Sequence, residues 1–177
     1  MKKIVTAFII IVSLIVTYTI LAKEEPSSEL FAKKLPAFSL QDPFGNTFTN
    51  KSFSKDGLVL VVTAPILKNR SAQKKWSQYL LKAKAGSKAK LVYLEDMQPS
   101  FFKGKAMRGM RKDYEFGKEP ILLIDSRGEI RSSLKVPQKK TVVLVYDDNG
   151  KLIYSETGKP SVEAAEMIWE KVKDSTH

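Results

Sequence analysis

Two kinds of hydrophobic pattern alternate along most of the chain. Short continuous runs of apolar, often β-branched residues lie at 58–63, 90–94, 121–124 and 141–146. Runs of this length are typical of strands that are buried on both faces of a sheet. Segments with apolar residues at helical spacing separate and follow these runs. The alternation predicts an α/β fold with parallel strand pairing in its first half.

The helical segments are predicted from the spacing of their apolar residues. In residues 71–85 the apolar side consists of Ala72, Trp76, Tyr79, Leu80 and Ala83. Residues 100–114 form a second, basic helix, which Gly104 and Gly109 weaken because glycine is a poor helix former. A short helical piece is expected near 129–134. The last helix follows Pro160, with an apolar side made of Val162, Ala165, Ile168, Trp169 and Val172.

The C-terminal part of the chain predicts an antiparallel edge of the sheet. The strand at 141–146 leads into the turn "DDNG" at 147–150, where the Asn-Gly pair suits positive φ angles. A partner strand is expected at 151–155. Residues 37–40 are a shorter strand candidate ahead of the turn residues "DPFGN".

The N-terminus has the pattern of a membrane segment. Residues 4–22 carry no charge and follow Lys2 and Lys3. As a helix they would span about 28 Å, close to the thickness of a bilayer core. A secretory signal has a shorter apolar region, roughly 7–15 residues, and a small residue where Ile20 stands before Ala22. An uncleaved anchor is therefore favoured; a cleaved signal peptide and a buried soluble helix are the alternatives.

Three parts of the chain follow from these patterns. Residues 1–22 are the anchor or signal peptide, 23–34 are a polar linker, and 35–177 form one domain. The lysines before the apolar segment are expected to stay in the cytoplasm, which places the domain outside it. If the segment is cleaved, the domain is secreted instead.

Composition excludes several classes of function. The chain has 177 residues, of which 43% are hydrophobic, so it can bury a core. It has no cysteine, which removes disulfides, thiol redox chemistry, thiolate metal sites and cysteine nucleophiles. Its one histidine is the last residue, His177, so a histidine-based triad or zinc site is not expected. We expect no metal and no cofactor.

The charge is concentrated in one quarter of the chain. The net charge is +11. Residues 68–112 contain thirteen Lys or Arg and only two acidic residues, Glu95 and Asp96, while the charges of the remaining residues cancel. Any electrostatic partner is therefore expected to meet this segment.

Four segments, in this order, resemble a known family: "LPAFSLQDPFGNTFT", "GLVLVVTA", "PILLIDSRGEIRSSLKVP" and "TVVLVYDDNGKLIYSETG". They are similar to the redoxin branch of the thioredoxin-like superfamily. This branch includes peroxiredoxins, such as alkyl hydroperoxide reductase-like proteins, and membrane-tethered thiol-disulfide oxidoreductases. The resemblance covers roughly residues 35–172. It implies a thioredoxin-like three-layer sandwich with a central mixed sheet.

The chain departs from this family at the redox site. Aligned on Ala64, the family's two cysteines would fall at Leu67 and Arg70. The hydroxyls of Thr63 and Ser71 lie nearby, but they have no histidine base to activate them. Thiol redox and peroxidase activity are excluded, and the sequence does not support another enzymatic activity.

Pro137 resembles the cis-proline that lies beside the redox site in this family. Here Gln138, Lys139 and Lys140 follow it before the next strand, which is longer than the usual spacing. An ordinary trans proline in a loop is the alternative.

The leading interpretation is a non-catalytic binding or scaffold module that uses the former redox-site end to hold a protein or peptide. The loop at 65–70 and the region of 137–140 are expected to lie close together. Apolar contact is assigned to Ile66 and Leu67, next to Pro137, and attraction of acidic partners to Lys68, Arg70, Lys139 and Lys140.

The alternative function is a basic module that binds anionic lipid or an envelope polymer through residues 68–112. Its cations on the second helix are Lys103, Lys105, Arg108, Arg111 and Lys112. A solvated helix face with core residues among Phe101, Phe102, Met107 and Met110 explains the same segment without a partner. Because helices after successive parallel strands are expected on opposite sheet faces, the two basic helices would not form one patch. Nucleic acid is not an expected partner of an exported domain.

Overall fold

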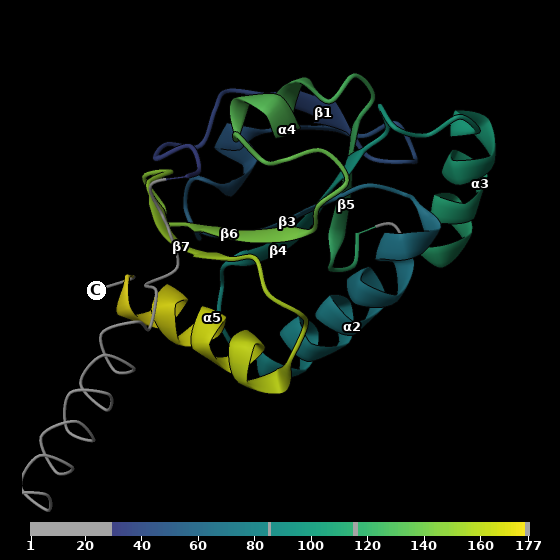
Figure 1. The fold of residues 1–177 in the computed structure, drawn as a ribbon. Helices are drawn as coiled ribbons and strands as arrows, with labels where there is room; N and C mark the ends of the chain where they lie inside the picture. Colours follow the sequence, from purple (N-terminus) through teal and green to yellow (C-terminus); the bar gives the residue numbers. More distant parts are fainter. Residues whose placement is uncertain (1–29, 85, 115–116, 176–177) are drawn as a thin grey trace, which may run out of the picture.

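A mixed seven-stranded sheet forms the centre of the domain (Figure 1). The computed structural model describes residues 30–175 apart from 85 and 115–116. The strands are β1 (Ser39–Gln41), β2 (Thr47–Thr49), β3 (Leu58–Thr63), β4 (Lys90–Asp96), β5 (Ile121–Asp125), β6 (Val142–Tyr146) and β7 (Leu152–Glu156), in the spatial order β2-β1-β5-β4-β3-β6-β7. The pairs β3–β4 and β4–β5 are parallel, and the outer pairs are antiparallel. The predicted α/β class and mixed sheet are confirmed.

The helices lie mainly on one face of this sheet. They are α2 (Leu67–Ala83), α3 (Lys103–Asp113), α4 (Glu129–Ser133) and α5 (Val162–Asp174), with a 3-10 helix η1 (Asn50–Phe53). Figure 1 shows α2 and α5 side by side below the sheet, with α3 at its right and α4 above. One core cluster includes side chains of α2, α3 and α5, which confirms that these three helices share a face.

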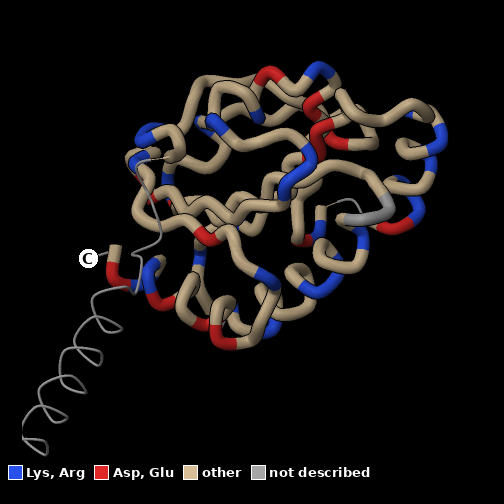
Figure 2. Tube along the Cα trace, in the orientation of Figure 1, with Lys and Arg blue, Asp and Glu red and all other residues tan. Residues whose placement is uncertain are grey.

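The expectation that α2 and α3 cover opposite faces is wrong. Strands β3, β4 and β5 are adjacent and follow one another in the same direction across the sheet. Parallel strand connections are right-handed, so two successive connections that advance in the same direction place their helices on the same face. The basic segments of α2 and α3 therefore lie on one side of the molecule (Figure 2).

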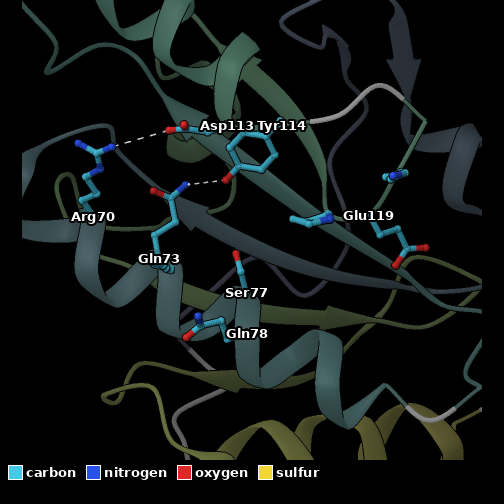
Figure 3. A pocket seen from close by; sticks show the side chains of 10 residues that line it. Arg70, Gln73, Ser77, Gln78, Asp113, Tyr114 and Glu119 are labelled. Atoms are coloured by element: carbon cyan, nitrogen blue, oxygen red, sulfur yellow. Dashed lines mark hydrogen bonds and ion pairs between the residues drawn. The ribbon is translucent and has the colours of Figure 1, made fainter.

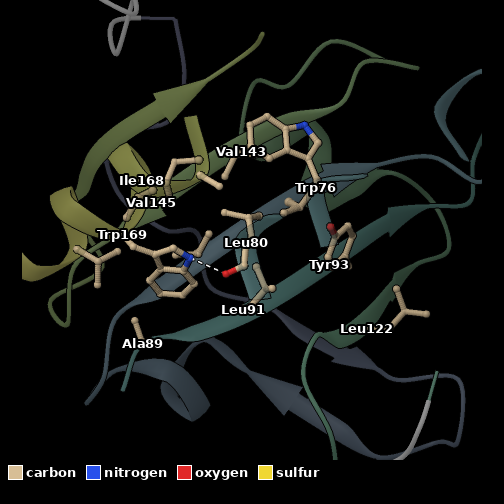
Figure 4. Packing of buried hydrophobic residues seen from close by; sticks show 14 of the residues in the cluster. Trp76, Leu80, Ala89, Leu91, Tyr93, Leu122, Val143, Val145, Ile168 and Trp169 are labelled. Atoms are coloured by element: carbon tan, nitrogen blue, oxygen red, sulfur yellow. Dashed lines mark hydrogen bonds between the residues drawn. The ribbon is translucent and has the colours of Figure 1, made fainter. Parts of the chain in front are cut away.

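Two tryptophans anchor the helical layer to the sheet (Figure 4). Trp76 of α2 and Trp169 of α5 are both fully buried, and the indole of Trp169 donates a hydrogen bond of 2.8 Å to the carbonyl oxygen of Leu80. This bond satisfies a polar atom that would otherwise be buried without a partner. Val162, which was predicted on the apolar side of α5, is 40% exposed because it is the first residue of that helix.

The second face is covered by shorter elements. Phe53 of η1, and Leu134 and Val136 after α4, pack there against the sheet. Asp125, at the end of β5, accepts hydrogen bonds from the backbone of Glu129 and Arg131, which fixes α4 over this face. These contacts complete the predicted three-layer arrangement.

The chain just before the predicted domain boundary also contacts the fold. Phe31 is buried, and the backbone N–H of Ala32 donates to the carbonyl oxygen of Leu134. Lys34 pairs with Lys151 in an isolated bridge. The predicted membrane segment, residues 4–22, lies outside the described residues. Within the part that the structure describes, no helix is both long enough and apolar enough to cross a membrane.

Candidate functional site

Strand β3 leads directly into the former redox-site end, which is the loop at 65–70 and residues 137–140. It is buried along its whole length and ends at Thr63, and α2 begins only four residues later. Ile66 precedes the helix with an extended backbone, at φ −109° and ψ 148°, and its side chain gives no capping hydrogen bond. The start of α2 was predicted near Ser71, where a hydroxyl side chain is typical of a helix cap. The helix instead begins at Leu67.

This earlier start changes the setting of the predicted binding residues. Leu67, Lys68 and Arg70 belong to the first turn of α2 rather than to a loop. The side chains of Leu67 and Lys68 are outside what the structure describes. Arg70 is exposed, and its guanidinium lies 3.8 Å from the carboxylate of Asp113, so α2 and α3 are joined at this end.

Asn69 connects the start of α2 to the second predicted segment. Its side chain is buried, and its amide nitrogen lies 3.4 Å from the carbonyl oxygens of both Ala64 and Lys139. The hydroxyls of Thr63 and Thr141 also lie 3.3 Å apart. The structure therefore brings the loop at 65–70 and residues 137–140 together, as the sequence predicted.

The loop of Pro137, Lys139 and Lys140 is exposed, and its geometry departs from the family pattern. The peptide bond before Pro137 is trans; within the described ranges the cis peptide bond joins Glu119 and Pro120. The expected cis proline at 137 is therefore wrong. The difference comes from the extra length of the loop between Pro137 and β6. In this loop the N–H of Lys140 donates to the carbonyl oxygen of Pro137 in a turn, and Lys139 has a left-handed backbone with φ +63°.

A cavity of about 650 Å³ lies between the N-terminal half of α2 and the whole of α3. Ile66 lines it, together with the two phenylalanines that precede α3. Phe101 is 98% exposed and Phe102 is 75% exposed, although both are large apolar side chains. Ala106, Gly109 and Met110 of α3 form the wall facing α2. The cavity is thus mainly apolar and open beside exposed aromatic rings.

A buried carboxylate lies among these apolar residues. Glu95 of β4 lines the cavity and is 1% exposed. One of its oxygens accepts a hydrogen bond from the side-chain amide of Gln73, while Oε2 has no hydrogen-bond partner among the described residues. Burial raises the pKa of Glu95 to about 7; the Gln73 bond lowers it and the charge of Asp96 raises it further.

Two tyrosines complete this polar group, together with Ser77 of α2. Tyr93 donates to the backbone carbonyl of Gln73 at 3.2 Å and accepts from Ser77 at 3.0 Å. The amide of Gln73 also reaches the hydroxyl of Tyr114, at 3.3 Å (Figure 3). Burial raises the pKa of both tyrosines above its usual range, so they remain neutral hydrogen-bonding groups.

A second, more polar hollow of about 520 Å³ continues from the first. Figure 3 shows it between α2 and the chain that follows α3. The two hollows share Arg70, Gln73, Asp113 and Tyr114. Glu119 at its other end is engaged by Lys84, and Lys90 lies 3.9 Å from it. The shared residues form a polar partition at one side of the apolar cavity.

The predicted basic surface is present as exposed side chains on one helix. The cations of α3 are Lys103, Lys105, Arg108, Arg111 and Lys112, and all are exposed. Two of them are held by the fold: Lys103 donates to the carbonyl oxygen of Ser126, and Arg111 donates to that of Pro43. Of the four residues considered for the core, Met110 is buried and Met107 is half-buried, but Phe101 and Phe102 are not.

Comparison with solved structures identifies the fold. No protein-family model and no curated protein sequence matches the chain. A putative thiol:disulfide interchange protein DsbE from Chlorobium tepidum is similar over 83% of this chain and 98% of its own, with TM-score 0.60 and 16% identity. The chain has the thioredoxin-like fold.

Two further structures show the same similarity to this thioredoxin-like domain. BsSco, a member of the Sco family of cytochrome c oxidase assembly proteins, matches 81% of this chain and 94% of its own, with TM-score 0.63 and 14% identity. The pneumococcal exposed lipoprotein thioredoxin Etrx1 from Streptococcus pneumoniae matches 78% and 99%, with TM-score 0.58 and 17% identity. The predicted redoxin-type fold is confirmed, and the domain has it without any cysteine.

Sequence reasoning missed several residues of this site. Glu95 was counted only as one of two acids within a basic segment, and Gln73 and Asn69 were not singled out. A usable signal exists for Glu95, because an acidic residue within the buried run "LVYLE" needs a compensating partner. No local signal marks Asn69, whose partner Lys139 lies 70 residues away.

Proposed function

We propose that the chain is an exported, non-catalytic thioredoxin-like domain that binds a segment of a partner protein where α2 begins. The observation that carries this proposal is the apolar cavity between α2 and α3, with Phe101 and Phe102 exposed beside it. Adjacent exposed aromatic rings beside a hollow are typical of interaction surfaces rather than of solvated ones. Thiol exchange is excluded, because no cysteine is present to form a thiolate.

Export is supported by two observations. Residues 4–22 are uncharged and follow two lysines, as in a signal anchor. The similar structures include a secreted Mycobacterium tuberculosis disulfide oxidoreductase and the pneumococcal exposed lipoprotein thioredoxin. We place the domain outside the cytoplasm, held by the N-terminal segment or released by its cleavage.

Affinity capture after in-cell cross-linking tests the proposed binding end. The tagged full-length protein is compared with a variant in which Phe101 and Phe102 are both changed to Ser. Leu81→Ser is the matched control: Leu81 is also an exposed apolar residue, but it lies about 21 Å along α2 from the start of the helix. We expect one or more partners to be lost in the phenylalanine variant and kept in the control. The same partners in all three samples would contradict the proposal.

The cations of the same end are tested separately. Lys68, Arg70, Lys139 and Lys140 are changed to Glu together. If the partner is acidic, this variant should lose it as the phenylalanine variant does. Because Arg70 is already engaged by Asp113, the single change Arg70→Glu should have a smaller effect than Lys139→Glu combined with Lys140→Glu.

Binding to anionic lipid is the second candidate, favoured by the placement of α2 and α3 on one face with five exposed cations on α3. With residues 1–22 removed, the protein is mixed with vesicles that contain either phosphatidylglycerol or only phosphatidylcholine. Binding to the anionic vesicles alone, falling steeply between 50 and roughly 300 mM salt, would support this candidate. Equal binding to both vesicle types would exclude it.

A further inference from the structure

Among the described residues, Oε2 of Glu95 is a buried acceptor without a donor. The residue is 1% exposed, and its other oxygen is already used by Gln73. A buried carboxylate is costly unless it is paired or hydrogen-bonded, and an unused acceptor inside a protein needs an explanation. Here the carboxylate lines a cavity of about 650 Å³ that is open to the outside, so a group from another molecule can supply the missing donor.

Glu95 is the acidic group of the cavity that the neighbouring charges do not neutralise. Arg70 and Asp113 neutralise each other at the rim, and Lys105 is an exposed cation of α3. Tyr93 and Tyr114 are hydrogen-bonding neutral groups, and Asp96 on the same strand forms its own ion pair with Arg131, at 2.8 Å. None of these groups provides a donor to Oε2.

We propose that the cavity takes the ammonium group of a lysine side chain from the partner segment, with Oε2 of Glu95 as its acceptor. This deepens the proposed function and rests on it, because it names what the partner inserts. The apolar wall of Ile66, Ala106 and Met110 suits the four-carbon stem of lysine. A guanidinium fits less well, since its paired donors need both carboxylate oxygens and Gln73 occupies one of them.

The inserted lysine has a positive charge, whereas the sequence predicted an acidic partner. The exposed cations at this end favour an acidic partner surface, whereas the cavity itself favours one cation. The two are compatible in a partner segment that has a single lysine within an otherwise neutral or acidic stretch. The lysine would then be selected by the interior of the site and the rest of the segment by its surroundings.

Binding of an ammonium group is linked to the proton on Glu95. The cation stabilises the charged carboxylate, so binding below about pH 7 must release a proton. The affinity for lysine should therefore rise with pH, by up to about tenfold per unit below pH 7, and become constant above it. In the saturated complex the pKa of Glu95 should be lower than in the unbound protein.

The experiment titrates full-length protein in neutral detergent micelles with three short peptides: Ac-Ala-Lys-Ala-NH2, its norleucine counterpart and its glutamate counterpart. Norleucine has the lysine stem without the ammonium group. Carbon-13 NMR of the Glu95 carboxyl and amide shifts of Gly109 and Met110 report binding in the cavity. We expect the lysine peptide to bind at least tenfold more tightly than the other two at pH 8, and Glu95→Gln to abolish this difference.

A pair of glycine variants tests the location. Gly109 lines the cavity and Gly104 does not, and both lie in α3. Apart from the adjacent residues and the backbone of α3 itself, a Cβ at either position would meet no described atom within 4 Å. Gly109→Leu should fill the cavity and weaken binding of the lysine peptide at least tenfold, while Gly104→Leu should leave the affinity for this peptide unchanged.

Three results would overturn the inference. Equal affinities for the lysine and norleucine peptides, or an unchanged lysine affinity in Glu95→Gln, would show that the cavity selects apolar groups only; partner loss in the Phe101 and Phe102 variant would then still support the proposed function. If no peptide binds and the Phe101 and Phe102 variant keeps its partners, both the inference and the proposed function are wrong. Glu95 would then serve only as an internal hydrogen-bond partner of Gln73.

Discussion

The side-chain amide of Asn69 donates a hydrogen bond to the backbone carbonyl of Lys139, joining the first turn of α2 to the loop before β6. The same nitrogen reaches the carbonyl of Ala64, and the side chain is buried. Asn69→Ala should lower the free energy of unfolding by about 1–2 kcal/mol, because the carbonyl oxygens of Ala64 and Lys139 both lose the Asn69 amide as a donor. Urea unfolding followed by tryptophan fluorescence measures this. Gln138→Ala, an exposed change in the same loop, should have an effect below about 0.5 kcal/mol.

Glu95 should make the stability depend on pH. The pKa of Glu95 is raised from 4.5 to about 7 in the folded protein. Between pH 4.5 and 7, the carboxyl is therefore protonated in the folded state and ionised in the unfolded state. Stability therefore falls as pH rises from 4.5 to 7 and is constant above. Glu95→Gln lacks this dependence and should gain stability relative to the parent by about 3 kcal/mol across the window. A constant difference between parent and variant from pH 4 to 8 would contradict the prediction.

Gly128 stands where any side chain would meet a buried group. It adopts φ +70° before α4, and a Cβ there would lie 2.9 Å from Oδ1 of Asp96 and 2.8 Å from Oε1 of Gln98. Gly128→Ala should cost more than about 2 kcal/mol, since the left-handed backbone alone costs about 1–2 kcal/mol. Gly45→Ala, with φ +94° and no atom within 4 Å, should show the backbone cost only. Thermal unfolding of the two variants side by side would separate the two effects, and equal losses would argue against the contact.

Lys139 is a non-glycine residue with a left-handed backbone, φ +63°. Lys139→Gly should raise the free energy of unfolding by up to about 1 kcal/mol, because glycine removes the side-chain strain at the cost of more freedom in the unfolded chain. Lys140→Gly is the control, since Lys140 does not have a positive φ, and it should destabilise by about 0.5–1 kcal/mol. The urea midpoints of the two variants should move in opposite directions.

The central strands were predictable because their side chains are buried on both faces. The predicted range 58–63 is β3 itself, and β5 and β6 differ from their predictions by one residue. The side of the sheet occupied by α3 was predicted wrongly, although the strand order decides it. That order depends on which strands pair, and the apolar runs do not differ enough to specify their neighbours.

The site was predictable in position but not in chemistry. The proximity of the two loops followed from the resemblance, and the hydrogen bond between Asn69 and Lys139 agrees with it. The cavity was not predictable, because it arises from a tertiary arrangement in which Phe101 and Phe102 stay outside the core. Their spacing allows burial as readily as exposure. The three residues between Pro137 and Thr141 were visible in the sequence, and they supported the trans alternative that the structure has.

Helix α3 is held to the molecule by few contacts. Met110 is its one buried residue, Gly104 and Gly109 lower its intrinsic helicity by about 1 kcal/mol each, and no side chain caps its start. Its backbone amides should therefore exchange with deuterated solvent faster than those of α2 or α5, through local openings that leave the sheet intact. Because α3 is one wall of the cavity, these openings change the distance between α3 and α2. The same site can therefore admit inserted side chains of different size.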